Sequence, residues 1–173
     1  RASVTAPAQS GTLTYTGAAL SPVWSGYDAT KLTIGGTTSG TNAGTYNATF
    51  TPTANYKWSD GTTTAKTVSW SIGKAAGSSS INKTAMVLGA AALSGTISVT
   101  RSGDGAVSAT SSNTRVATVS MSGTTVTVNA KANGTATITV NVAAGTNHTA
   151  SASKTCTVTV AIPTTTLNDN TWA

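Results

Sequence analysis

The sequence predicts an all-β protein that folds as two successive β-sandwiches. Thr, Ser, Gly and Ala dominate its 173 residues, 8% are charged and glutamate is absent, a composition that disfavours helices and favours pleated strands. Short segments of alternating apolar and polar residues recur between turns rich in Gly, Asn and Asp. The aromatic residues divide the chain, because all except Trp172 precede residue 75. A core rich in aromatic side chains followed by one that lacks them indicates two domains.

The aromatic-rich first domain is predicted at residues 1–74. Its strand candidates alternate with period two and comprise residues 31–34, 45–50 and 66–72. The Asp60–Gly61 step before the last of these predicts a tight hairpin turn. Inward-facing Tyr46, Phe50 and Trp70 are predicted to fill the core, since large rings compensate for a small domain.

The second domain is predicted at residues 75–162, after a small-polar hinge at 73–80. Seven alternating segments separated by short turns are typical of a β-sandwich, and they comprise residues 84–88, 96–100, 106–110, 115–120, 125–130, 135–142 and 154–160. Its core is predicted from Val128, Ile138, Val140 and Val158, with the lone cysteine, Cys156, as a small buried hydrophobe. Residues 163–173 are expected to be a linker or the start of a further module.

The stretch "NAGTYNATF" at 42–50 carries a structural motif. Asn42-x-Gly44-x-Tyr46-x-Ala48 has the spacing of the Asp-x-Gly-x-Tyr-x-Cys run of antibody-type domains, with alanine at the cysteine position. We expect the Tyr46 ring to point inward and its hydroxyl to tie the preceding loop, as in the tyrosine corner of immunoglobulin-like sandwiches. Gly44 would supply the bend, and Asn42 would hydrogen-bond the turn.

Two family resemblances follow from longer stretches. Residues 109–140, "ATSSNTRVATVS…TTVTVNAKANGTATITV", resemble the group 2 bacterial immunoglobulin-like domain of the intimin/invasin kind, although Val107 and Ala109 replace a large residue common there. The segments "TYTGAALSPVWSGYD" and "TNAGTYNATFTP" resemble immunoglobulin-like repeat modules of Gram-positive surface and phage-tail proteins. These resemblances imply two tandem Ig-like β-sandwich domains, located extracellularly on a bacterial cell surface or in a phage virion.

The residue inventory argues against catalysis and metal binding. Glycoside hydrolysis needs two facing carboxylates, and calcium sites need several converging ones, whereas Asp28, Asp60, Asp104 and Asp169 are scattered. A serine triad needs a histidine oriented by an acid, and His148 is expected to be a solvated loop residue. We therefore predict a protein that is not an enzyme, with no cofactor and no metal.

The charge distribution argues against nucleic acid as a partner. The net charge is +6, but it is spread over both halves without the cluster of cations that tracking a phosphate backbone requires. No apolar run reaches the roughly 18 residues of a membrane helix, so membrane insertion is not expected. A diffuse attraction to anionic cell-wall polymers is compatible with this charge.

Two functions remain open at the level of sequence. The first is a structural or adhesion module that spaces and presents neighbouring domains of the same chain, with weak attachment to cell-surface glycans. The second is a dedicated carbohydrate-binding module whose rings stack on sugars; its candidate residues are Trp24, Tyr27, Tyr56 and Trp58. The same rings would serve equally as the core of a small sandwich.

Overall fold

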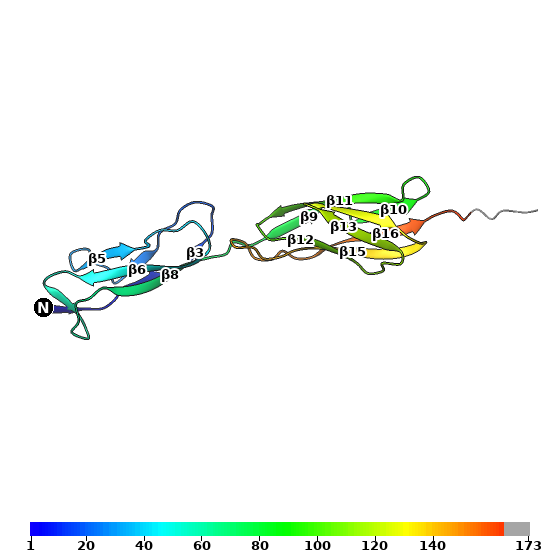
Figure 1. Ribbon diagram of the computed structural model, residues 1–173. Coiled ribbons are helices and arrows are strands. Elements are labelled where there is room, and N and C mark those ends of the chain that lie inside the picture. Colours follow the sequence, from blue (N-terminus) through cyan, green and yellow to red (C-terminus); the bar gives the residue numbers. More distant parts are fainter. Residues whose placement is uncertain (165–173) are drawn as a thin grey trace, which may run out of the picture. The chain divides into compact units, whose positions relative to one another are not determined.

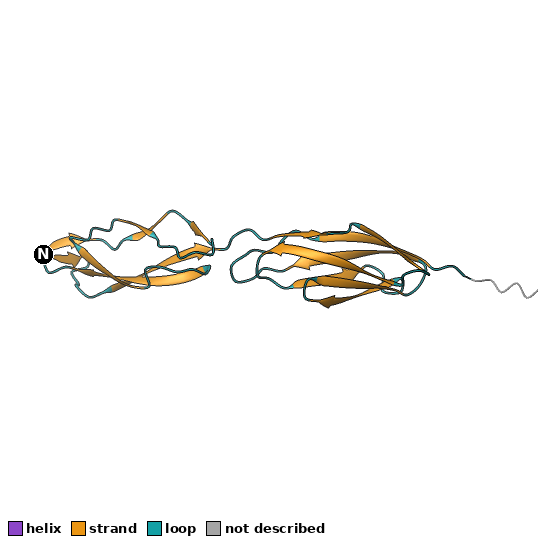
Figure 2. Ribbon diagram, turned by 90° about the horizontal axis from the view of Figure 1, so that it is seen from above, coloured by secondary structure: helices purple, strands orange, loops and turns teal. Residues whose placement is uncertain are grey.

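The computed structural model describes residues 1–164, and all of these lie in strands, turns or loops (Figure 2). They divide between two compact units, of which unit 1 comprises Arg1–Ala76 with Thr146–Thr149, and unit 2 comprises Gly77–Gly145 with the residues from Ala150 onward. The prediction of an all-β fold built from sandwiches is confirmed. Most of the predicted terminal segment 163–173, including Asp169 and Trp172, lies outside the described residues.

Unit 1 is built around one four-stranded sheet with two short ribbons beside it (Figure 1). The sheet order is β3-β8-β6-β5, while β2 pairs with β4 and β1 pairs with β7. β3 runs parallel to β8, and the other pairs within the sheet are antiparallel. The strands are β1 (Ala2–Val4), β2 (Ala8–Ser10), β3 (Leu13–Thr14), β4 (Val23–Ser25), β5 (Leu32–Gly36), β6 (Gly44–Pro52), β7 (Tyr56–Trp58) and β8 (Lys66–Gly73).

The three strands predicted for the first domain are confirmed as β5, β6 and β8, but the predicted hairpin is wrong. A tight turn does form there, since the Gly61 N–H donates to the Trp58 carbonyl at 2.9 Å and Trp58 N–H donates to Thr62 O at 2.8 Å. However, β6 and β8 are joined by the longer connection 53–65, which contains β7, and β7 pairs with β1. The five short strands were missed because two or three residues give too little alternation to detect.

Unit 2 is a sandwich of two four-stranded sheets, ordered β13-β14-β11-β9 and β10-β16-β15-β12. This is the immunoglobulin arrangement, with an additional early strand, β10, parallel to the last strand, β16. The seven predicted strands correspond to β10–β16; β9 was wrongly assigned to the hinge because its sequence, "SSSI", is almost wholly polar. The strands are β9 (Ser78–Ile81), β10 (Ala85–Gly89), β11 (Ser94–Ser102), β12 (Val107–Ser111), β13 (Ala117–Ser122), β14 (Thr125–Ala130), β15 (Gly134–Val142) and β16 (Lys154–Ala161).

Each unit has its own apolar core. In unit 1 the buried residues are Leu32, Ala48, Phe50, Trp58, Trp70 and Ile72, with Tyr46 packed against them and half-buried. In unit 2 the core is aliphatic, and all of the predicted residues are buried, with Ile138, Val128 and Val158 fully so. Cys156 is also fully buried, as predicted. Burial of each large side chain contributes on the order of 1.5–3 kcal/mol to its unit.

Candidate functional site

The loop before β6 holds the Tyr46 side chain at its hydroxyl and at its ring. The hydroxyl donates a hydrogen bond to the Asn42 backbone carbonyl at 2.6 Å. The ring stacks on Trp70 with centroids 4.6 Å apart and planes 22° apart. Gly40 also lies close to this ring, since an added Cβ there would stand 2.5 Å from Tyr46 Cζ. Gly44 begins β6 with a φ of +154°, a conformation that side chains rarely adopt.

Asn42 takes part in this corner through its backbone, whereas the sequence suggested its side chain. Its Oδ1 instead accepts a hydrogen bond from Asn147 Nδ2 at 3.2 Å, within unit 1. Asn147 Oδ1 also accepts from Ala43 N–H at 2.8 Å. The loop 42–44 is therefore fixed by a hydroxyl, an amide side chain and a glycine, all of which serve folding.

Trp58 is part of the core and cannot offer a face to a sugar. Its side chain is 1% exposed, and its indole Nε1 donates to the Thr64 carbonyl at 2.7 Å. Lys66 Nζ lies 5.2 Å from the ring centroid. This burial removes Trp58 from the candidate glycan-contacting residues, because a stacking platform requires an accessible ring.

The other three candidate aromatic residues are half-buried, and two of them pack on the same core ring. Trp24 meets Phe50 edge to face, with centroids 4.9 Å apart and planes 83° apart. Tyr27 packs on the same Phe50 at 5.6 Å. Tyr56 lies on β7, opposite Ala2 of β1. Trp24 and Tyr27 thus each direct part of their ring into the core, and their remaining surface is only partly accessible.

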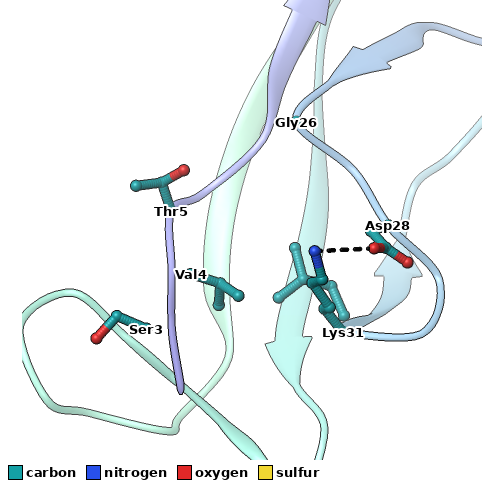
Figure 3. Close-up of a pocket in the computed structure, with 7 residues that line it drawn as sticks. Ser3, Val4, Thr5, Gly26, Asp28 and Lys31 are labelled. Atoms are coloured by element: carbon teal, nitrogen blue, oxygen red, sulfur yellow. Dashed lines mark ion pairs between the residues drawn. The ribbon is translucent and has the colours of Figure 1, made fainter.

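A hollow of about 260 Å³ opens in unit 1 beside the N-terminal strand (Figure 3). One wall carries the ion pair of Lys31 Nζ with Asp28 Oδ2, 3.1 Å apart. Figure 3 shows Val4 pointing toward this pair, whereas the hydroxyls of Ser3 and Thr5 point away. None of the four candidate aromatic residues is among the lining residues, which are Ser3, Val4, Thr5, Gly26, Asp28, Lys31 and Leu32.

The two aspartates of unit 1 brace turns. Asp28 Oδ1 accepts from the Thr30 hydroxyl at 2.6 Å and from Thr30 N–H at 2.9 Å. These bonds, with Lys31, lower the pKa of Asp28 from 3.8 to about 2. Asp60 repeats the arrangement with Thr62, and a 2.6 Å bond from Lys66 Nζ is the largest cause that depresses the pKa of Asp60. Both carboxylates are ionised and hydrogen-bonded, a state unsuited to general-acid catalysis.

His148 and Cys156, the one histidine and the one cysteine of the chain, both pack within the fold. His148 lies in the loop between β15 and β16, is half-buried in unit 1 and packs on Tyr15 with ring centroids 5.3 Å apart, so it is less solvated than predicted. Burial raises the pKa of the Cys156 thiol. Within residues 1–164, no three His, Cys, Asp or Glu side chains gather as metal ligands would. The same residues contain no helix long and apolar enough to span a membrane.

Two carboxamide side chains that the sequence did not single out bind backbone groups at the end of a unit. One binds within β8, the last strand of unit 1, and the other binds the residue that follows β16, the last strand of unit 2. Gln9 Nε2 donates to Ser71 O at 3.0 Å, and Ser71 N–H donates to Gln9 Oε1 at 2.9 Å. Likewise, Asn133 Nδ2 donates to Ile162 O at 2.9 Å and Ile162 N–H donates to Asn133 Oδ1 at 2.6 Å. Each side chain makes the two bonds that a neighbouring strand would make. We call them the Gln9 clamp and the Asn133 clamp.

Comparisons with known proteins assign no family. No protein-family model matches the chain, and no curated protein matches it in sequence. The group 2 immunoglobulin-like resemblance therefore stays a prediction.

Several solved structures share a partial likeness with the chain. Domains 4 and 5 of the S-layer protein SbsC share 25% identity over 68% of this chain, with a TM-score of 0.39; this chain spans 58% of that one. For SbsC domains 4–9 the identity is 23% over 73% of this chain and 19% of that chain, with a TM-score of 0.42. The fibronectin(III)-like modules of Clostridium thermocellum CbhA share 15% identity over 89% of this chain and 91% of that chain, with a TM-score of 0.40.

Proposed function

We propose that the chain is a non-enzymatic structural module of a larger extracellular protein, in which its two units space and present neighbouring domains. One observation carries this proposal: in each unit an early strand runs parallel to the last strand, β3 to β8 and β10 to β16. Parallel pairing means that the chain enters a unit at one end and leaves at the other (Figure 1). A spacer needs this arrangement, because antiparallel terminal strands would return the chain to its point of entry.

The surface of unit 2 supports a role in contact with solvent. Threonines of β15 and β16 face each other in register across the sheet, as in the pairs Thr135↔Thr159, Thr137↔Thr157 and Thr139↔Thr155. Hydroxyl groups hydrate such a face without charge, so its solubility depends little on pH or salt. The bacterial cell surface or a phage virion is the location implied by the two resemblances together, that of residues 109–140 and that of the first domain, and neighbouring domains of the same chain are the expected partners.

Weak attachment to cell-surface glycans is a secondary part of the proposal. Its support is limited to the partly exposed rings of Trp24, Tyr27 and Tyr56. A glycan array probed with the chain and with its Tyr27→Ala and Tyr56→Ala variants tests it. Binding lost in a variant whose melting temperature is unchanged would favour a dedicated carbohydrate-binding module over a spacer.

The spacing role can be measured by surface display. The chain is inserted between a membrane anchor and a fluorescent reporter, and energy transfer from the reporter to a membrane dye gives the reporter height. We expect transfer to fall on adding a second copy of the chain and to rise on deleting unit 2. A Gly/Ser linker with the same number of residues is the control, since its reach grows only as about the square root of its length. Unchanged transfer after adding a copy would refute the spacing role.

A further inference from the structure

We propose that the two units yield to tension in a fixed order: residues 1–14 of unit 1 detach first, the rest of unit 1 unfolds next, and unit 2 holds to the highest force. The inference rests on the proposed spacer function and deepens it, because a module between an anchor and a presented domain transmits any force on that domain. The chain would then act as a graded, extensible connector.

The direction of the load follows from the parallel terminal strands. Tension on the two ends of a unit pulls its early strand and its last strand in opposite directions along their own axes. The hydrogen bonds of the pair are then strained together, in shear, whereas peeling would break them one after another. Resistance to shear therefore grows with the number of residue pairs in register and with the apolar side chains that must slide. Forced unfolding is governed by the unfolding rate, which this barrier sets.

Unit 2 has the longer shear contact. β10 pairs with β16 over five residues, from Ala85↔Thr157 to Gly89↔Ala161, and the contact continues through a 2.9 Å bond from Thr157 N–H to Thr84 O. Preceding it, β9 pairs with β11 over four residues. Sliding β10 would also draw Met86 and Leu88, which are 8% and 2% exposed, out of the core.

The N-terminal segment of unit 1 is held by shorter contacts. β3 pairs with β8 over two residues, Leu13↔Ile72 and Thr14↔Gly73. β2 pairs with β4, and β1 with β7, over three residues each. These contacts belong to three different sheets, so they can break separately. The side chains of Val4 and Leu13 are only half-buried, which lowers the cost of each step.

The two carboxamide clamps lie where the load passes. The Gln9 clamp joins the N-terminal segment directly to β8, 62 residues away in sequence, and so adds two hydrogen bonds to the two-residue contact of β3. The Asn133 clamp holds Ile162, the first residue after β16, and within residues 1–164 these are the hydrogen bonds of unit 2 that tension from the C-terminal side reaches first. Release of residues 1–14 would free about 45–50 Å of chain in place of the roughly 30–40 Å that they span in the folded unit, while unit 2 stays folded.

Single-molecule stretching of the full chain between handles at its two ends tests the order. We expect a first release of only about 5–20 Å, the difference between the 45–50 Å of freed chain and the roughly 30–40 Å that these residues span in the folded unit. The remainder of unit 1 should follow, and then unit 2 at the highest force. Gln9→Glu replaces a donor by an oxygen facing the Ser71 carbonyl, and should raise the rate of the first event at a fixed force roughly tenfold. Gln9→Met removes both bonds without adding charge and should act in the same direction. Asn133→Asp is the matched change in unit 2 and should affect only the last event.

The outcomes separate this inference from the proposed function. Unfolding of unit 2 before unit 1, or a first event unaltered by both Gln9 variants, would overturn the order while leaving a spacer intact. Extension without any resolved rupture, as for a Gly/Ser chain, would overturn both the order and the load-bearing role. Three events in the expected order, with the first moved only by the Gln9 variants and the last only by Asn133→Asp, support the proposal.

Discussion

Replacing Gly40 by alanine should destabilise unit 1 through one identified contact. The added Cβ would lie 2.5 Å from Cζ and 2.8 Å from Cε1 and the hydroxyl oxygen of Tyr46, so the ring must move. That movement disturbs both the stack on Trp70 and the 2.6 Å bond to Asn42 O. Overpacking of this kind costs about 1–3 kcal/mol, which corresponds to a fall in melting temperature of about 4–8 °C per kcal/mol for a domain of this size.

The double-mutant cycle with Tyr46→Ala isolates this cause. Without the ring, Gly40→Ala meets no steric obstacle from Tyr46, and its φ does not lie in the region reserved for glycine. It should then be neutral, or stabilising by about 0.4–1 kcal/mol, because alanine restricts the unfolded chain. The coupling energy between the two positions should therefore exceed about 1 kcal/mol.

Tryptophan fluorescence in a urea titration is the appropriate assay. All aromatic residues before residue 75 belong to unit 1, and three of them are tryptophans. Trp172 is replaced by phenylalanine so that the signal reports unit 1 alone. An equal cost of Gly40→Ala with and without the Tyr46 ring would refute this account of the corner.

Three further outcomes are expected. The Asp28 pKa of about 2 lies below its ordinary 3.8, so its ionised form stabilises unit 1 above about pH 4, and that contribution is lost as the pH falls toward 2. The unfolding midpoint of the Asp28→Asn variant should therefore depend less on pH over this range than that of the unsubstituted chain. An unchanged pH dependence would contradict the assigned turn bonds. Cys156→Ser should destabilise unit 2 by about 1–3 kcal/mol by burying a hydroxyl, and Ellman's reagent should label the native thiol only after unfolding; rapid labelling of the folded protein would show that the site is open. Gly105→Ala should destabilise unit 2 by more than about 3 kcal/mol, since its Cβ would overlap the Ala143 carbonyl oxygen. A melting temperature for unit 2, followed by circular dichroism, that equals that of the unsubstituted chain would contradict the close backbone approach.

The sequence predicted the long strands because alternation over five or more residues records burial on one face. β15 shows this well, with Ala136, Ile138, Val140 and Val142 all buried and the intervening residues partly exposed. The same rule fails for β3, with two residues, and for β9, where three serines hide a strand paired to β11. Pairing with a distant partner, which no local pattern records, decides such elements.

The candidate site was less predictable because burial of a ring depends on the whole core. Trp58 and Tyr56 share a strand, yet one ring is buried and the other is half-exposed. Long-range contacts were also beyond local reasoning: the Gln9 clamp joins residues 62 apart, and nothing in the residues around Gln9 indicates a partner. Asn133 could be read only as a turn residue before Gly134, although its amide holds the end of β16.

The most direct test of the central claim is the distance between the entry and the exit of each unit. Spin labels on Ser78→Cys and Ala161→Cys would report unit 2, and labels on Ala2→Cys and Gly73→Cys would report unit 1, with buried Cys156 inert to the label. Because the parallel strands place entry and exit at opposite ends, each pair should give a separation of about 30–40 Å at roughly 3.3 Å per residue. A separation below about 15 Å, three strand spacings, would place the two ends side by side and contradict the spacer.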